Sequence, residues 1–290
     1  MFNFKRNTKV YLVYGSSKYK LEVYPDLSVS QTYDEQSIDR KTLHNPLDLH
    51  KHATIIRASV ANFSFTVPVF DNESSTQIQK ELELATSYLT GNAPNFDLYF
   101  ESDEITYKLE KAVFDRMTLN LSRDAVITAS LSGNGSKLAE FIGEVPGTLV
   151  PAPTRDYCRV GTIDVDIGTQ QMGSITNLVV EFANEIEWTK NDTIHATLEG
   201  DIQYQTSYVL KGRQVNGSIS EYLTSDNQDQ LYDTTTNTSV DITINGGFLR
   251  FYLPSTVFTR RTEFGDVFTR TYDYRLNTNS QTVKPIYKGV

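Results

Sequence analysis

The alternation of apolar and polar residues predicts β-strands along most of the chain. In YKLEVYPDLSVSQTY, residues 19–33, Leu27 and Val29 alternate with serines, which is the period of two expected for a strand with one covered face. A second strand candidate, DRKTLHNPLDLH at 39–50, follows the polar DEQSI. We expect these two segments to form a long hairpin arm. The next candidate, ATIIRASVANFSFTVPVF at 53–70, is mostly β-branched and aromatic, and Pro68 marks a strand end or an edge.

A change of period predicts one helix within residues 72–91, NESSTQIQKELELATSYLTG. Ser74 and Gln77 fit a capping box, and Gly91 closes the segment. Apolar residues recur at helical spacing between them, at Ile78, Leu82, Ala85 and Leu89. After the helix, residues 95–135 predict a meander of about four short antiparallel strands with polar turns.

A segment rich in Gly and Pro, GEVPGTLVPAPTRD at 143–156, has the composition of a linker. We therefore place a first domain at 1–145, a linker at 146–156 and a second domain at 157–290.

The second half repeats the order of the first. Both halves contain a Val-Phe-x-Arg tetrad, at 113–116 and 257–260, followed by a polar turn and a Thr-rich strand. TSYVLKGRQVNGSISEYL corresponds to ATIIRASVANFSFTVPVF, so that Asn62 aligns with Asn216. A weaker helix, SDNQDQLYDTT at 225–235 with Asp226 as its cap, takes the place of the first helix. A period this long indicates domain duplication rather than a solenoid.

Composition limits the classes of function. The 36 acidic and 27 basic residues give a net charge of −9, which argues against tight nucleic-acid binding through phosphates. A lone cysteine, Cys158, excludes an intrachain disulfide. We expect neither a signal peptide nor a membrane-spanning helix, because the N-terminus and the rest of the chain contain no long apolar run.

Several residue clusters invite a chemical interpretation, and each has a simpler one. His44, His50 and His52 lie close in sequence, but no further ligand is nearby, and solvated histidines are the favoured interpretation. The acidic pairs at 103–104 and 164–166 show no sign of convergence. Glu185 and Glu187 share one face of a strand, with Ile186 and Trp188 on the other. No catalytic motif occurs, so a structural role without cofactors or metals is expected.

Three pairs of segments carry a resemblance to a known family. They are SVSQTYDEQS with EIEWTKNDTI, RASVANFSFTV with GRQVNGSISEY, and VFDRMTLNLS with VFTRRTEFGD. In this pattern and order the chain resembles the tail tube proteins, or major tail proteins, of long-tailed bacteriophages. The resemblance implies a mainly β fold, with two tandem β-sandwich or barrel domains that each carry one flanking α-helix.

The same resemblance implies a function and partners. A duplicated chain would form trimeric rings with approximate sixfold symmetry, which stack into a tube for DNA passage. The implied partners are further copies of the chain, tape measure, terminator and distal tail proteins, and double-stranded DNA in transit. The protein would belong to the virion tail, assembled in the host cytoplasm, without enzymatic activity or membrane insertion.

Two groups of residues are candidates for these roles. An acidic channel repels DNA rather than holding it, so the candidate channel residues are Glu185, Glu187 and Glu199. The candidate ring-stacking residues lie in the predicted arm: Asp34, Glu35, Asp39, Arg40, His44 and His50. Two alternatives stay open, a tail hub or distal tail component, and a carbohydrate-binding β-sandwich whose Tyr and Phe side chains stack on sugar rings.

Overall fold

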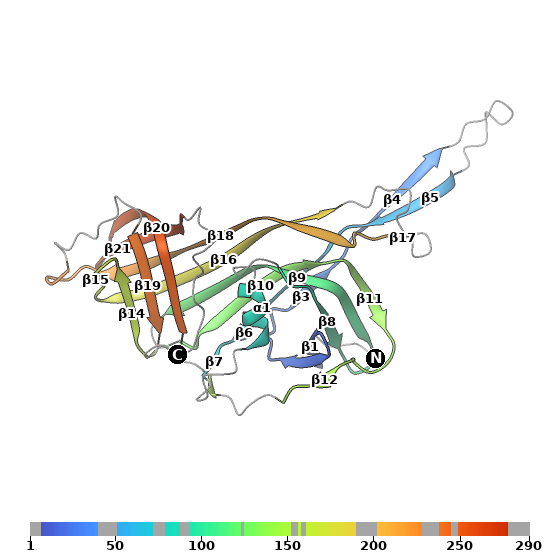
Figure 1. Cartoon of the computed structure of the whole chain (residues 1–290), viewed down its shortest axis with the longest axis horizontal. Coiled ribbons are helices and arrows are strands. Elements are labelled where there is room, and N and C mark those ends of the chain that lie inside the picture. The colour runs from blue at the N-terminus through green and yellow to red at the C-terminus, as the bar shows by residue number, and fades with distance from the viewer. Residues whose placement is uncertain are drawn as a thin grey trace.

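The computed structural model describes residues 7–39, 51–71, 79–87, 93–122, 125–151, 156–157, 161–189, 202–227, 238–244 and 249–277. Strands dominate this part of the chain (Figure 1), which confirms the predicted mainly β class. The helix α1 (Lys80–Ser87) packs beside the sheets of the first half.

The described residues of the first half form thirteen strands, which range from two to seventeen residues in length. They are β1 (Lys9–Tyr14), β2 (Ser17–Leu21), β3 (Ser28–Ser30), β4 (Tyr33–Asp39), β5 (Lys51–Ala58), β6 (Ala61–Pro68), β7 (Phe70–Asp71), β8 (Phe96–Glu101), β9 (Thr106–Ser122), β10 (Thr128–Gly135), β11 (Lys137–Phe141), β12 (Thr148–Leu149) and β13 (Asp156–Tyr157).

The second half has fewer and longer strands. They are β14 (Ile163–Ile167), β15 (Gln170–Gln171), β16 (Ile175–Thr189), β17 (Ile202–Gln203), β18 (Ser207–Tyr222), β19 (Thr238–Ile244), β20 (Leu249–Phe264) and β21 (Phe268–Leu276).

One sheet of sixteen strands runs through both halves. Its main path is β12-β2-β1-β8-β9-β16-β18-β21-β20-β19-β14-β15. From β9, β10, β6 and β3 continue on another path, and β11 also pairs with β9. The halves meet where β9 pairs antiparallel with β16, from Arg116 opposite Ala183 to Ser122 opposite Asn177. The backbone hydrogen bonds of this joint make the two halves neighbours in one sheet.

The strand order is the same on each side of this joint. It is β3-β6-β10-β9-β8-β1-β2 in the first half and β16-β18-β21-β20-β19-β14-β15 in the second. The registers agree as well. Asn134 lies opposite both Asn62 and Val113, and Arg275 lies opposite both Asn216 and Val257. These are the residues that the sequence alignment had paired, whereas the domain boundary at 146–156 stays a prediction.

The core lies on one face of the sheet and continues through both halves. In the first half, the rings of Phe63, Phe96 and Phe114 contact one another with centroids 4.6 to 6.3 Å apart. Leu82 and Ala85 of α1 are buried in the same core, as their helical spacing predicted. The other residues proposed for this helix (Ser74, Gln77, Ile78, Leu89 and Gly91) lie outside the described residues, as do 228–235 of the second predicted helix.

Two sequence-based expectations about strands were wrong. The meander contains three strands instead of about four, because β9 is one strand of seventeen residues. It continues through Lys111, which has a positive φ of 51°. It pairs with β8 up to Ala112 and with β10 from Val113 onward. The polar DEQSI segment is not a turn but part of β4, which pairs with β5 from Tyr33 opposite Ala58 to Asp39 opposite Lys51. Its described side chains, Tyr33, Asp34 and Glu35, are all exposed, and a polar run of this kind has no apolar alternation by which to recognise a strand. Residues 40–50 of the second predicted arm strand lie outside the described residues.

The predicted linker is held against the first half. β12 pairs in parallel with β2, and the Thr148 amide donates to the Ser16 carbonyl at 2.9 Å. The Lys18 ammonium also donates to the Val145 carbonyl, at 2.9 Å. Residues 145–150 are therefore anchored to a sheet edge.

Candidate functional site

The face of the sheet opposite the core is lined by short polar side chains, and we call it the polar face. One row crosses six strands, each residue directly opposite the next: Thr66, Ser130, Thr118, Glu181, Asn216 and Arg275. Their neighbours along the strands, such as Phe65, Leu131 and Met117, are buried in the core. Alternation along each strand therefore gives the sheet one apolar and one hydrogen-bonding face.

Side chains on the polar face bond to one another. The Thr66 hydroxyl donates to Asp26 Oδ2 at 2.5 Å and lies 3.2 Å from the Ser130 hydroxyl. Asp115 accepts from the Ser132 hydroxyl at 2.6 Å and from Asn134 Nδ2 at 3.0 Å. These bonds cross from strand to strand and fix the side chains in place.

The charges of the polar face are locally neutralised. Arg116 Nε lies 3.9 Å from Glu181 Oε1, across the joint between β9 and β16. Asn216 Nδ2 donates to the same Glu181 oxygen at 3.4 Å. Arg261 Nε lies 3.0 Å from Glu263 Oε1 on β20. The pair of Arg116 with Glu181 could not be predicted from the sequence, because its partners come from different halves of the chain.

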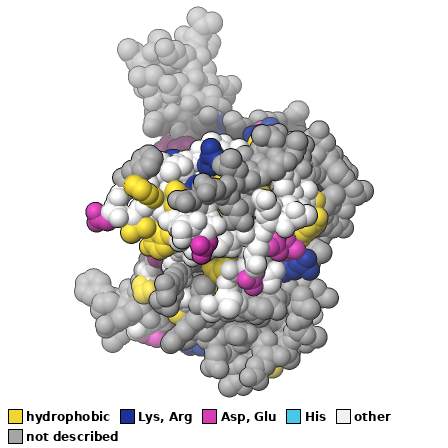
Figure 2. All heavy atoms as spheres, turned by 90° about the vertical axis from the view of Figure 1, so that its left-hand side faces the viewer, with side chains coloured by type: hydrophobic (Ala, Val, Ile, Leu, Met, Phe, Trp, Pro, Cys, Tyr) yellow, Lys and Arg dark blue, Asp and Glu magenta, His cyan; other side chains and the backbone are white. Residues whose placement is uncertain are grey.

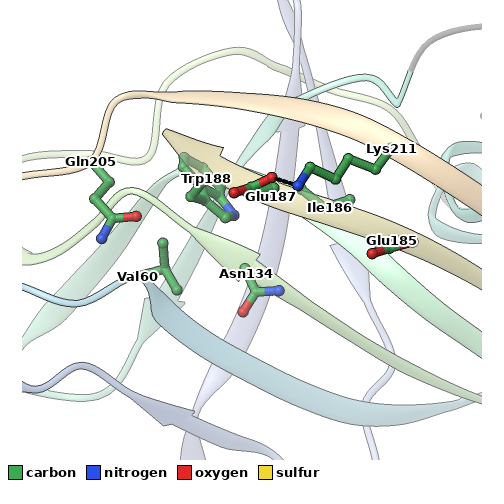
Figure 3. Close-up of a pocket in the computed structure, with 8 residues that line it drawn as sticks. All are labelled: Val60, Asn134, Glu185, Ile186, Glu187, Trp188, Gln205 and Lys211. Atoms are coloured by element: carbon green, nitrogen blue, oxygen red, sulfur yellow. Dashed lines mark ion pairs between the residues drawn. The ribbon is translucent and has the colours of Figure 1, made fainter. Parts of the chain in front are cut away.

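Glu185 and Glu187 are exposed on β16, with Ile186 half-buried and Trp188 buried. This confirms the predicted acidic face over an apolar underside. Figure 3 shows Glu187 beside the Lys211 ammonium, with which it forms an ion pair. The hydrogen bond that the Lys211 ammonium donates to the Glu187 carboxylate raises the pKa of Lys211. One of the two carboxylates is thus neutralised, and Glu199 lies outside the described residues.

A shallow hollow of about 470 Å³ lies next to this ion pair. Side chains from both halves line it (Figure 3): Val60, Asn134, Glu185, Ile186, Glu187, Trp188, Gln205 and Lys211. The buried Trp188 Nε1 has no hydrogen-bond partner within the described part of the chain. The two halves are in contact beside this hollow, because the Ser136 hydroxyl donates to the Gln205 carbonyl at 2.6 Å.

The candidate stacking residues belong to an arm that extends from the sheets (Figure 1) and consists of β4, β5 and β17. Asp34 and Glu35 are exposed on β4. Asp39 ends β4, whereas Arg40, His44 and His50 lie outside the described residues. The second half contributes β17, which pairs in parallel with Ile56 and Arg57 of β5.

Many of the large aromatic side chains that the structure describes lie in the core. Phe65, Tyr99, Phe182 and Tyr272 are among the largest fully buried side chains. Within the described ranges, no group of three or more His, Cys, Asp or Glu residues is placed to hold a metal ion. No helix in that part of the chain is long and apolar enough to cross a membrane.

Comparison with known proteins gives one result that covers the whole chain. The model of the Bacteriophage Baseplate Tube Protein Family matches residues 1–290. No curated protein matches the sequence. The family consists of structural proteins of phage tails and baseplates, which agrees with the coarser part of the resemblance seen in the sequence. With its continuous sheet and its polar face, the chain belongs to the bacteriophage baseplate tube protein family.

Proposed function

We propose that this protein forms a ring-shaped wall segment of the tail tube at the baseplate, with three copies closing a ring of approximate sixfold symmetry. One observation carries the proposal: the two halves have the same strand order and register and are already joined edge to edge by β9 and β16. A chain of this kind supplies two near-equivalent wall segments. The unpaired edges of its sheet are satisfied when the ring closes.

In this proposal the polar face lines the channel through which DNA passes. A channel should not hold the duplex, and densely placed Lys and Arg would do so by releasing counterions. Short hydroxyl and amide side chains, with Arg116 held by Glu181, give a surface that hydrates well and attracts phosphates weakly. Of the three candidate channel residues, Glu185 and, from its place in the sequence, Glu199 add negative charge, whereas Glu187 offsets the cation of Lys211.

The arm of β4 and β5 is proposed to contact the neighbouring ring. Its exposed carboxylates, Asp34 and Glu35, stand on a hairpin that extends away from the sheets. The partners are then further copies of the chain and adjoining tail proteins, such as tape measure, terminator or distal tail proteins. The site of action is the virion tail, after assembly in the host cytoplasm.

Electron microscopy and native mass spectrometry of the purified protein test the ring. We expect annular particles with six similar lobes and the mass of three chains. A protein that stays monomeric at high concentration and is retained on a glycan array would contradict the proposal and support a carbohydrate-binding function.

Charge reversal tests the channel face. The variant Glu185→Lys/Glu187→Lys should still form rings but should bind duplex DNA, because it places two new cations beside Lys211. The logarithm of its association constant for DNA should fall linearly with the logarithm of the salt concentration. The slope should be about −0.9 for each phosphate that the protein contacts. The matched control is Glu140→Lys/Glu144→Lys, which makes the same charge change at exposed positions outside the polar face. Equal DNA binding by both variants, or loss of rings in the first alone, would refute the assignment of this face.

A further inference from the structure

The described sheet that forms the polar face ends in two strands with an open edge. At one end, β3 pairs with β6 alone. At the other end, β20 pairs with β19 up to Thr256 and with β21 from Thr256 to Phe264. Among the described residues, no strand covers the second side of β20 beyond Thr256. Open edges of this kind recruit further strands.

The equivalent edges inside the chain are already joined. The order of strands makes β20 the counterpart of β9 and β3 the counterpart of β16. From this equivalence we propose that the ring closes by antiparallel pairing of β3 of one copy with β20 of the next, in the register of the β9–β16 joint. The inference rests on the proposed function and specifies the surface by which copies of the chain meet.

The register follows from the observed pairs. Ser130 and Leu131 of β10 lie opposite Thr118 and Met117 of β9. Their counterparts in β21, Thr271 and Tyr272, lie opposite Arg261 and Arg260 of β20. Thr118 and Arg261 are therefore equivalent. The β-bulge of β9, which lies between the residues opposite Ser132 and Gly133, adds one residue to β9 and is taken into account in this equivalence.

The observed pairs also show which residues of β3 and β16 are equivalent. Asn62 lies opposite Ser30, and its counterpart Asn216 lies opposite Glu181, so Ser30 is equivalent to Glu181. Because Glu181 lies opposite Thr118 in the joint, Ser30 should lie opposite Arg261 of the next copy. Seven residue pairs would then form between the segment 26–32, which contains β3, and the segment 259–265 at the end of β20, as many as in the observed joint.

The chemistry of the two edges agrees with this register. Val29 would face Thr262 on the side of the core, and Ser28 would face Glu263 on the polar face. No like charges lie directly opposite, an arrangement that would be destabilising. Residues 259–263 of β20 and Ser28 and Ser30 of β3 are exposed in the single chain.

Large apolar side chains are exposed next to both edges. Tyr24 and Tyr33 flank β3 and are 39% and 46% exposed, and Val257 on β20 is 37% exposed. Figure 2 shows the end of the molecule that carries β20 and β21, where apolar side chains interrupt a polar surface with scattered charges. A neighbouring copy would cover such side chains.

Disulfide trapping tests the register. In a Cys158→Ser background, Ser30→Cys/Arg261→Cys should form an interchain disulfide, since directly opposed residues have Cα atoms about 4.5 to 5.5 Å apart. On a non-reducing gel, the final product should be a covalent trimer. The positive control is Thr118→Cys/Glu181→Cys, the equivalent pair within one chain, which should form an intrachain disulfide. The negative control is Ser30→Cys/Glu263→Cys, whose diagonal spacing of about 7–8 Å is too long for efficient bonding.

The outcomes separate this inference from the proposed function. If rings form and the control pair at 118 and 181 is oxidised, but the pair at 30 and 261 is not, the register is wrong and the ring stands. Preferential bonding of the pair at 30 and 263 would likewise overturn the register. A ladder of covalent polymers without a dominant trimer would overturn closure. Absence of any assembly in electron micrographs would overturn both proposals.

Discussion

The buried ion pair of the second half gives the sharpest test of the packing. Glu221 on β18 and Arg270 on β21 lie directly opposite each other, with exposures of 0% and 5%. Arg270 Nη1 is 3.5 Å from Glu221 Oε1. The equivalent pair in the first half is Val67 opposite Ala129, both fully buried. The fold therefore accommodates either a buried ion pair or two apolar side chains at this position.

Two magnitudes bound the effect of Arg270→Met, which removes the cation but keeps most of the volume. At an effective dielectric constant of about 20, charges 3.5 Å apart attract by about 5 kcal/mol. Burial, however, raises the pKa of Glu221 above its ordinary value of 4.5, and Arg270 opposes that rise. Without Arg270 the carboxyl takes up a proton instead of staying charged. Protonating a carboxyl with a pKa of 4.5 at pH 7 costs about 3 kcal/mol. This is less than the lost attraction, so the cost of protonation is the upper limit of the destabilisation.

The loss must therefore depend on pH. A carboxyl with a raised pKa in the folded state binds a proton that the unfolded state releases, so its contribution to stability falls as pH rises above about 4.5. We expect Arg270→Met to cost up to about 3 kcal/mol at pH 7 and much less at pH 4.5. Urea unfolding at both pH values, followed by the fluorescence of the single Trp188 and by circular dichroism, measures the difference.

The double variant Glu221→Leu/Arg270→Met is the control. Replacing both charges by apolar side chains of similar volume is often neutral or stabilising by about 1–4 kcal/mol. It should restore the stability lost in Arg270→Met and remove the pH dependence. If the double variant is as unstable as the single one, or if the loss in the single variant is the same at both pH values, the reasoning from buried charge is wrong.

Three further predictions concern the sheet and the arm. Gly217→Ala should destabilise by about 1–3 kcal/mol, because a Cβ there would lie 2.0 Å from the Val179 carbonyl oxygen and 2.5 Å from the Tyr274 hydroxyl; chemical denaturation measures this. Tyr274→Phe should cost about 1 kcal/mol in the same assay, since it removes the 3.0 Å hydrogen bond to that carbonyl. Asp34→Lys/Glu35→Lys should leave single rings intact and reduce their stacking, seen by sedimentation; unchanged stacking would contradict the role of the arm.

The same glycine illustrates how the halves differ within one plan. Tyr274 lies directly opposite Gly217 in the second half, and Phe63 lies directly opposite Gly133 in the first. The positions of aromatic and glycine are exchanged between the equivalent strands. In both cases the aromatic ring occupies the space that a Cβ on the glycine would fill. The strand pair therefore needs one aromatic residue and one glycine, and either strand can supply either of them.

The sequence by itself determined where most strands lie, which faces they bury and that Asn62 corresponds to Asn216 and Val113 to Val257. It misaligned SVSQTYDEQS with EIEWTKNDTI, which sets Ser30 against Glu187, whereas the strand registers make Ser30 equivalent to Glu181. Alternation is a local property, so Leu27 with Val29, and Ile186 with Trp188, could be assigned without a fold. The pairing of Asn62 with Asn216 in the alignment agrees with the registers of their strands. The sequence predicted an arm but left DEQSI out of its strands, because this polar segment of β4 has no apolar alternation. The full length of β9 was not predicted, because its alternation of buried and exposed residues is interrupted near Lys111.

Only the tertiary structure decided how these strands combine. Whether β9 pairs with β16 depends on hydrogen bonds between segments some sixty residues apart in the chain, and no local pattern encodes such a contact. The same joint brought Arg116 to Glu181, and a neighbouring strand brought Lys211 to Glu187. Each of these pairs joins one cation to one anion, so it neutralises two charges that the sequence counts as free and leaves the net charge of the polar face unchanged.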